Sequence, residues 1–121
     1  MRTASATGVA MVVFALAVAS GAAEPGGAKV VANRFVSAAN HGDYATVCRL
    51  YSRRYLKITR AECAELYAWA ENFYGPFDYR IVGQRRLSSG RWHVELIRWR
   101  HPSFIELARE RLGWKIVAGG W

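Results

Sequence analysis

The side chains best suited to proton transfer or anion binding lie in the last third of the chain. His93 and Glu95 are two positions apart, and Arg109 and Arg111 repeat this spacing further along. In an extended strand every second side chain points to the same face, so each pair is expected on one side of a sheet. An imidazole, a carboxylate and guanidinium groups that meet on a concave surface can bind an anion or move a proton. His93 and Glu95 are therefore the catalytic candidates.

A simpler interpretation of these residues stays open. If Glu95 faces Arg109 across neighbouring strands, the two form an ion pair at the rim of the sheet, which contributes little to stability and needs no chemistry. The remaining polar and aromatic side chains expected on this inner face are ligand-binding candidates: Arg85, Arg109, Arg111, Tyr79 and Trp99. For this cluster we favour the structural interpretation over a functional one, and the pattern assures no catalytic residue. A secreted ribonuclease, which needs a base, an acid and a phosphate clamp together, is a weaker alternative.

Cys48 and Cys63 are the only two cysteines. Zinc would need two of the three histidines as further ligands, but the chain has neither a C-x-x-C nor an H-x-x-x-H spacing. An oxidising compartment favours a disulfide instead, and both thiols are expected on inward-facing helical stripes. We therefore predict a disulfide, with no metal and no cofactor.

Residues 1–23 have the pattern of an export signal. Arg2 precedes an apolar run from Val9 to Val18, and small residues follow at Gly21 and Ala23. A bilayer span needs about 20 continuous apolar residues, and Ser20 interrupts the run too early. We expect cleavage after residue 23, which leaves 98 of the 121 residues in a secreted or periplasmic chain without a membrane span.

The exported chain is strongly basic. Loss of Arg2 with the leader lowers the formal net charge from +8 to +7. Outside the cytoplasm the abundant polyanions are lipid headgroups and envelope polymers, so an anionic envelope component or small molecule is the candidate partner and nucleic acid is not expected. The densest basic stretch is 52–60, which would attract an acidic partner or form a solvated loop.

Apolar periodicity and turn residues divide the exported part into a flexible lead-in at 24–27 and one domain at 28–121. Apolar residues recur at helical spacing before Pro76 and alternate after it. Asp43 and Thr59 are expected to cap helices, and Gly75-Pro76 to end the last one. We expect helices over 28–40, 44–51 and 59–74, and antiparallel strands over 77–87, 91–100, 104–111 and 114–118.

Turns at 88–90, 101–103 and 112–113 fix the predicted strand register. This register pairs opposite charges, which supports it: Arg98 with Glu106, Glu95 with Arg109, Asp78 with Arg100, and Glu110 with Lys115. It also assigns one sheet face to the helices, with Phe77, Tyr79, Ile81, Ile97, Trp99, Ile105, Leu107, Trp114 and Ile116. The other face is too apolar for a wet surface, which predicts a homodimer there through Trp92, Val94, Leu96 and Phe104.

Three helices followed by a curved antiparallel sheet resemble the NTF2-like superfamily, and its small exported members most. Gly42-Asp43 joins the first two helices, and Gly113-Trp114-Lys115-Ile116 opens the last strand. The resemblance implies an α+β cone with a cavity, frequent dimerisation through the outer sheet face, and functions that range from isomerase or dehydratase to pure binding. Asp78 falls on the outward face, which argues against it as a cavity base. We therefore expect an exported binding or accessory domain, with an NTF2-like isomerase, dehydratase or hydrolase as the alternative.

Overall fold

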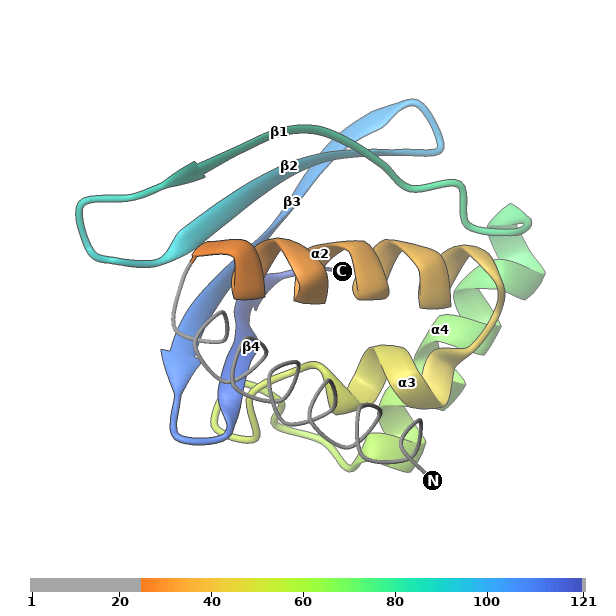
Figure 1. The fold of residues 1–121 in the computed structure, drawn as a ribbon. Coiled ribbons are helices and arrows are strands. Elements are labelled where there is room, and N and C mark those ends of the chain that lie inside the picture. The colour runs from red at the N-terminus through yellow and green to blue at the C-terminus, as the bar shows by residue number, and fades with distance from the viewer. Residues whose placement is uncertain (1–24, 121) are drawn as a thin grey trace, which may run out of the picture.

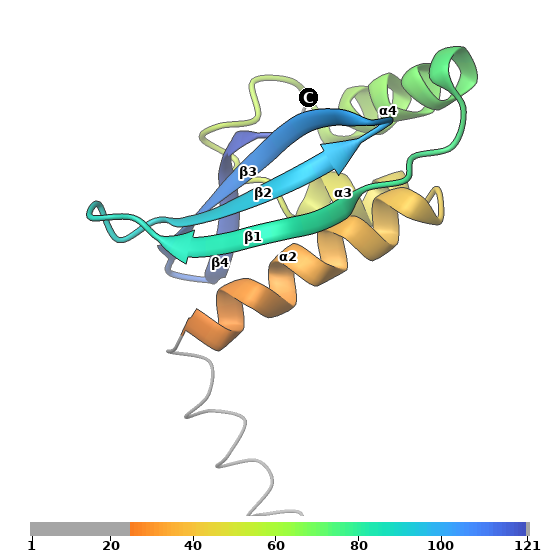
Figure 2. The same cartoon turned by 90° about the horizontal axis from the view of Figure 1, so that it is seen from above.

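The computed structural model describes residues 25–120, and the predicted signal peptide lies outside them. The described part is an α+β fold in which three helices come before four strands along the chain. The strands form an antiparallel sheet, and α2 (Pro25–Asn40) runs along one face of it (Figures 1 and 2). None of the helices within this part has the length and apolar run that crossing a bilayer requires.

The helices follow the predicted start and stop signals. Asp43 caps α3 (Tyr44–Arg49) by accepting from the Thr46 amide, and Thr59 forms a capping box with Glu62 at the start of α4 (Arg60–Tyr74). Gly75 ends α4 with a φ of 94°, a backbone conformation that favours glycine. One boundary differs, because α2 already begins at Pro25 and takes up part of the predicted lead-in. Proline fits the first turn of a helix, where its missing N–H costs nothing.

The core lies between α2 and the inner face of the sheet. Ala28, Ala32 and Phe35 recur at helical spacing on α2, and all three are fully buried. α2 contacts β1 (Arg80–Arg86), β2 (Trp92–Arg98) and β4 (Gly113–Gly119). The small alanine side chains let the helix approach the sheet closely, so that bulky residues of the strands fill the space between them.

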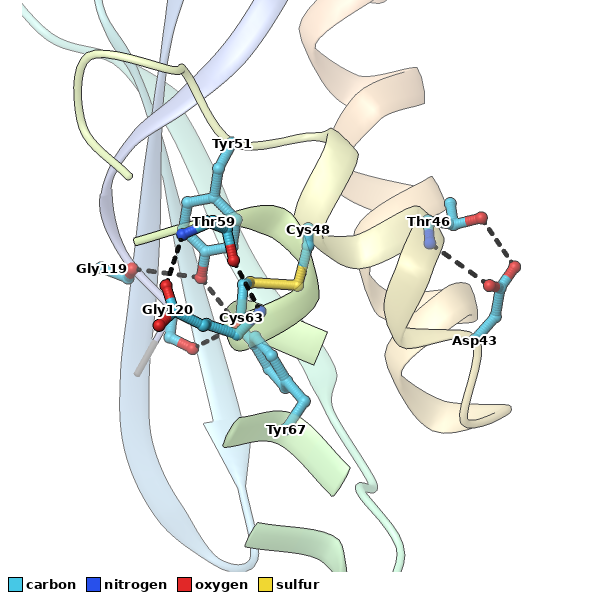
Figure 3. The surroundings of a disulfide bond; sticks show 10 residues. Asp43, Thr46, Cys48, Tyr51, Thr59, Cys63, Tyr67, Gly119 and Gly120 are labelled. Atoms are coloured by element: carbon cyan, nitrogen blue, oxygen red, sulfur yellow. Dashed lines mark hydrogen bonds between the residues drawn. A yellow bond between two sulfur atoms is a disulfide. The ribbon is translucent and has the colours of Figure 1, made fainter. Parts of the chain in front are cut away.

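The disulfide between Cys48 and Cys63 is confirmed (Figure 3). Both cysteines are fully buried, and their Cα atoms lie 6.0 Å apart. The bond joins α3, which has six residues, to α4. A helix this short is marginal alone, so the disulfide and the core contacts of Tyr44 and Val47 hold α3 in place.

The sheet has the order β1-β2-β3-β4, as expected for consecutive hairpins. The predicted turn at 101–103 is wrong, because His101 and Pro102 already belong to β3 (His101–Glu110). The chain reverses at Trp99 and Arg100, whose φ angles are 50° and 71°. Two left-handed residues in succession make the tight two-residue hairpin turn that matches sheet twist.

This turn changes the register between β2 and β3. Glu95 lies opposite Phe104 and Arg98 opposite His101, so the predicted Glu95–Arg109 and Arg98–Glu106 pairs are wrong. The partners differ from the predicted ones by five positions. Because five is odd, the side chains of β2 exchange faces relative to the prediction.

The exchange overturns the predicted dimer surface. Trp92, Val94 and Leu96 point to the helices and are 8%, 0% and 1% exposed, so they cannot line a contact between two copies. Phe104, which is 41% exposed, does lie on the outer face. The apolar outer face from which we predict a dimer therefore does not include these three residues. Dimerisation itself stays a prediction.

The β3–β4 hairpin keeps its predicted faces, and the chain leading into β1 keeps them as far as Ile81. Lys115 pairs with Ala108 and Glu110 with Gly113, so the predicted Glu110–Lys115 pair is wrong by two positions, an even shift that leaves the faces unchanged. A β-bulge between Ile81 and Gly83 interrupts the β1–β2 register. It keeps Tyr79 in the core although β2 has turned over.

Candidate functional site

The two catalytic candidates lie on the outer face of the sheet rather than in a cavity. Glu95 pairs with Arg85 at 3.3 Å, and these side chains are 48% and 61% exposed. His93 Nδ1 lies 3.0 Å from a Glu106 carboxylate oxygen, and Arg91 approaches the other oxygen at 3.4 Å. The exposed Arg85–Glu95 pair is worth little to stability. The predicted inward cluster of His93, Glu95 and the arginines is therefore wrong, because the register of β2 turns both candidates outward.

The interior between helices and sheet is filled by tyrosines. Tyr51, Tyr67 and Tyr79 are at most 2% exposed. Tyr67 donates to the carbonyl of Gly120 at 2.7 Å, and its hydroxyl lies 2.7 Å from that of Tyr51 (Figure 3). Burial raises the pKa of all three phenols, so they stay neutral and hydrogen-bonded. Tyr79, a ligand-binding candidate, is thus a core residue.

A hollow of about 60 Å³ remains beside this tyrosine cluster. Pockets that hold small molecules have volumes of about 300–1,000 Å³, so the hollow is too small for a substrate. Its lining comes from α4, the segment before β1, the end of β2 and the residue after β4: Leu66, Tyr67, Ala70, Phe77, Arg98 and Gly120. The hollow at this position is therefore far smaller than the cavity that the family resemblance implies.

Trp99, another ligand-binding candidate, lies in the β2–β3 turn and packs against the end of α4 and the segment that leads to β1. Its ring lies 4.7 Å from that of Phe77 and 5.0 Å from that of Tyr74. Its indole N–H donates to the Pro76 carbonyl at 2.9 Å, and its backbone amide donates to Asp78. The Trp99 side chain therefore stabilises the turn and does not lie in a ligand pocket.

A groove of about 550 Å³ lies on the outside of the domain, between the 52–60 connector and the β3–β4 hairpin. Cationic side chains predominate in its lining: Arg53, Arg54, Arg60, Arg111 and Lys115. Glu110 is the one carboxylate among the lining residues, and Ser52 donates to it at 2.7 Å. Five cations against one hydrogen-bonded carboxylate make the groove strongly positive.

Backbone pairing brings the two halves of this groove together. The amide of Ser52 donates to the carbonyl of Ile116 at 2.8 Å, and the amide of Ile116 donates to that of Leu50 at 2.9 Å. The segment that enters the connector is thereby attached to the free edge of β4. Lys115 reaches across the same edge to the Arg49 carbonyl at 3.3 Å. The arginines of the connector consequently face the hairpin that carries Arg111.

The sequence indicates the parts of this groove but not their assembly. The connector is the densest basic stretch in the chain, and Arg111 is a ligand-binding candidate that the predicted register places on the inner face. Arg109 lines an adjoining groove of about 470 Å³. The signal that was missing is the pairing of Tyr51 with Ile116, an isolated bridge that leaves no periodicity in the sequence.

The groove offers charge rather than an obvious catalytic centre. Guanidinium groups bind carboxylate and phosphate oxygens through paired hydrogen bonds, which suits recognition of anions. Over residues 25–120, no three His, Cys, Asp or Glu side chains are grouped closely enough to hold a metal ion. The arrangement is therefore suited to holding an anionic group.

Comparison with known proteins supports the fold and leaves the activity open. No protein-family model matches the chain, and no curated protein matches it. Among solved structures it is similar to a provisionally assigned aromatic ring hydroxylase from Novosphingobium aromaticivorans, with a TM-score of 0.52 and 10% sequence identity; the match covers 76% of this chain and 90% of that chain. At this identity the likeness concerns the fold alone.

Proposed function

We propose that this chain is an exported binding domain of NTF2-like fold that holds an anionic partner in the basic groove, with no assured catalysis. The observation that carries the proposal is the groove itself, where five cations surround one space and the single carboxylate is engaged by Ser52. The predicted leader and the disulfide support a location outside the cytoplasm, since disulfides persist in oxidising compartments.

The filled interior favours binding over the enzymatic alternative. An NTF2-like isomerase, dehydratase or hydrolase would need room for its substrate beside an inward acid or base. The interior hollow measures about 60 Å³, and both His93 and Glu95 lie on the other side of the sheet. The name of the structural neighbour adds no weight to a hydroxylase activity here.

The proposal is tested by measuring the affinity of the exported protein for inorganic tripolyphosphate by calorimetry. A double variant, Arg53→Gln with Arg60→Gln, removes two cations from the groove. We expect at least a tenfold loss of affinity, because a hydrogen bond to a charged group contributes about 1.5–3 kcal/mol. The affinity of the unmodified protein should also fall steeply with salt.

A matched control removes the same charge elsewhere. Arg80 and Arg86 are exposed on β1, at the opposite edge of the sheet from β4. Arg80→Gln with Arg86→Gln should leave the affinity within twofold. Equal losses in both double variants would mean that only net charge matters, and the groove would then not be the binding site.

A further inference from the structure

A second basic groove adjoins the first. It has a volume of about 470 Å³, and it lies between the connector, the last residues of β3 and Arg91, which directly precedes β2. Its cationic lining residues are Arg54, Lys57, Arg91 and Arg109. Of these, Arg91 is in an ion pair with Glu106 at 3.4 Å.

The two grooves share one wall. Ser52, Arg54 and Glu110 line both of them. Ser52 is 2% exposed and donates to the Glu110 carboxylate, so a buried hydrogen bond holds two of the shared residues together. Arg54 is exposed at the same place and belongs to both basic surfaces. A ligand that leaves the first groove past Arg54 therefore enters the second.

We propose that the partner is a linear polymer of phosphate groups without bases, which follows both grooves across Arg54. This inference rests on the proposed anion-binding function and narrows its ligand. A single small anion would occupy one groove and leave the cations of the other unused. A chain of repeated negative charges can neutralise both sets, and each neutralised charge adds to the affinity by releasing counterions.

The aromatic residues argue against nucleic acid as this polymer. Proteins that bind single strands stack the bases on accessible aromatic rings. The aromatic residues that line the grooves are Tyr51 and Tyr55. Tyr51 is buried, and the Tyr55 ring stacks on it with centroids 5.8 Å apart, while the Tyr55 hydroxyl donates to Gly119.

The exposed aromatic rings line neither groove: Phe104 lies on β3, where it stacks on His93, and the others lie on α4. Trp69 and Phe73 stack on each other at 5.4 Å along α4, and Phe73 contacts Tyr74. These rings belong to the later turns of α4, whereas Arg60, at its first residue, lines the groove. The path between the grooves therefore presents charge without stacking platforms, which fits a polymer recognised through its phosphates.

The test compares inorganic tripolyphosphate with polyphosphate chains of tens of units, at equal ionic strength. For the unmodified protein we expect at least a tenfold higher affinity for the long chain after correction for the number of overlapping sites. Lys57→Gln with Arg109→Gln removes charge from the second groove alone. This variant should lose at least fivefold in affinity for the long chain and stay within twofold for tripolyphosphate, whereas Arg53→Gln with Arg60→Gln should weaken both.

The outcomes separate this inference from the proposed function. No binding of either phosphate probe would overturn both. Binding of tripolyphosphate without a gain from length, or a long-chain affinity that Lys57→Gln with Arg109→Gln leaves unchanged, would overturn the two-groove path alone. Tighter binding of an oligothymidylate than of polyphosphate of equal charge would overturn the choice of a polymer without bases. Arg91→Gln provides a second variant of the same groove if the double variant unfolds.

Discussion

At the scale of single residues, Gly119 and Gly120 allow the backbone after β4 to pack closely against the tyrosine cluster. Their φ angles are 79° and 90°, in the left-handed region that favours glycine. A Cβ on Gly119 would collide with the Phe104 carbonyl, and one on Gly120 would collide with the Tyr51 hydroxyl. The carbonyl of Gly120 accepts from Tyr67, so this close approach is part of the core.

Gly120→Ala is therefore expected to lower the free energy of unfolding by more than the same substitution at a left-handed glycine with open space around it. Gly90 is the matched control, because its φ is 92° and a Cβ there would meet open space. We expect a loss of about 1 kcal/mol for Gly90→Ala and at least twice that for Gly120→Ala. Urea unfolding measures both free energies. Equal losses would show that the tyrosine cluster shifts to accommodate the added Cβ without a loss of stability.

Asp43 should make the stability of the domain depend on acidic pH. Hydrogen bonds from the Thr46 side chain and amide lower the pKa of Asp43. A carboxyl with a lowered folded-state pKa stabilises the fold above its unfolded pKa of about 4, and this contribution is lost as the pH falls through the folded value. Asp43→Asn keeps a capping side chain without titration. Its melting temperature should fall less than that of the unmodified protein between pH 6 and pH 2, and parallel curves would refute the assignment.

At the scale of elements, the β2–β3 turn explains most of what sequence analysis missed. The helices were predictable because Asp43 and Thr59 are strong capping residues and because the apolar positions recur regularly. Trp99 and Arg100 are residues that rarely take left-handed conformations, whereas Pro102 is a conventional turn signal. Pro102 is tolerated in β3 because that part of the strand has no partner in β4.

This turn also carries a prediction about stability. Arg100 is exposed and has a φ of 71°, so Arg100→Gly relieves backbone strain without loss of packing. We expect the free energy of unfolding to rise by about 0.5–1 kcal/mol. Trp99→Gly relieves similar strain but removes the contacts with Phe77 and Tyr74, and it should destabilise. A loss of stability in both variants would mean that the turn is not strained.

The candidate site was predictable only in part for a related reason. The basic composition of 52–60 is visible in the sequence, but nothing there shows which hairpin it meets. That depends on the isolated pairing of Tyr51 with Ile116. The outward position of His93 and Glu95 depends in turn on the β2–β3 register, where an error of five positions moves both side chains through the sheet.

At the scale of the whole molecule, stability depends on one covalent bond and a small core. The disulfide closes a loop with a sequence separation of 15, and a loop of this length contributes about 3 kcal/mol. Cys48→Ala with Cys63→Ala is expected to lower the free energy of unfolding by about this amount. Reductant should lower the stability of the unmodified protein and leave that of the double variant unchanged; an effect of reductant on both would point to another cause.

The same bond encloses the segment that lines both basic grooves. Arg53, Arg54, Lys57 and Arg60 all lie between Cys48 and Cys63 in the sequence, so the disulfide closes the very segment that supplies half of the basic surface. In the reduced chain this segment keeps more conformational freedom, and ordering it upon contact with an anion costs more free energy. Oxidation would then act as a maturation step. A reduced chain would compete more weakly for polyanions than the oxidised chain, and affinity would rise when the disulfide forms.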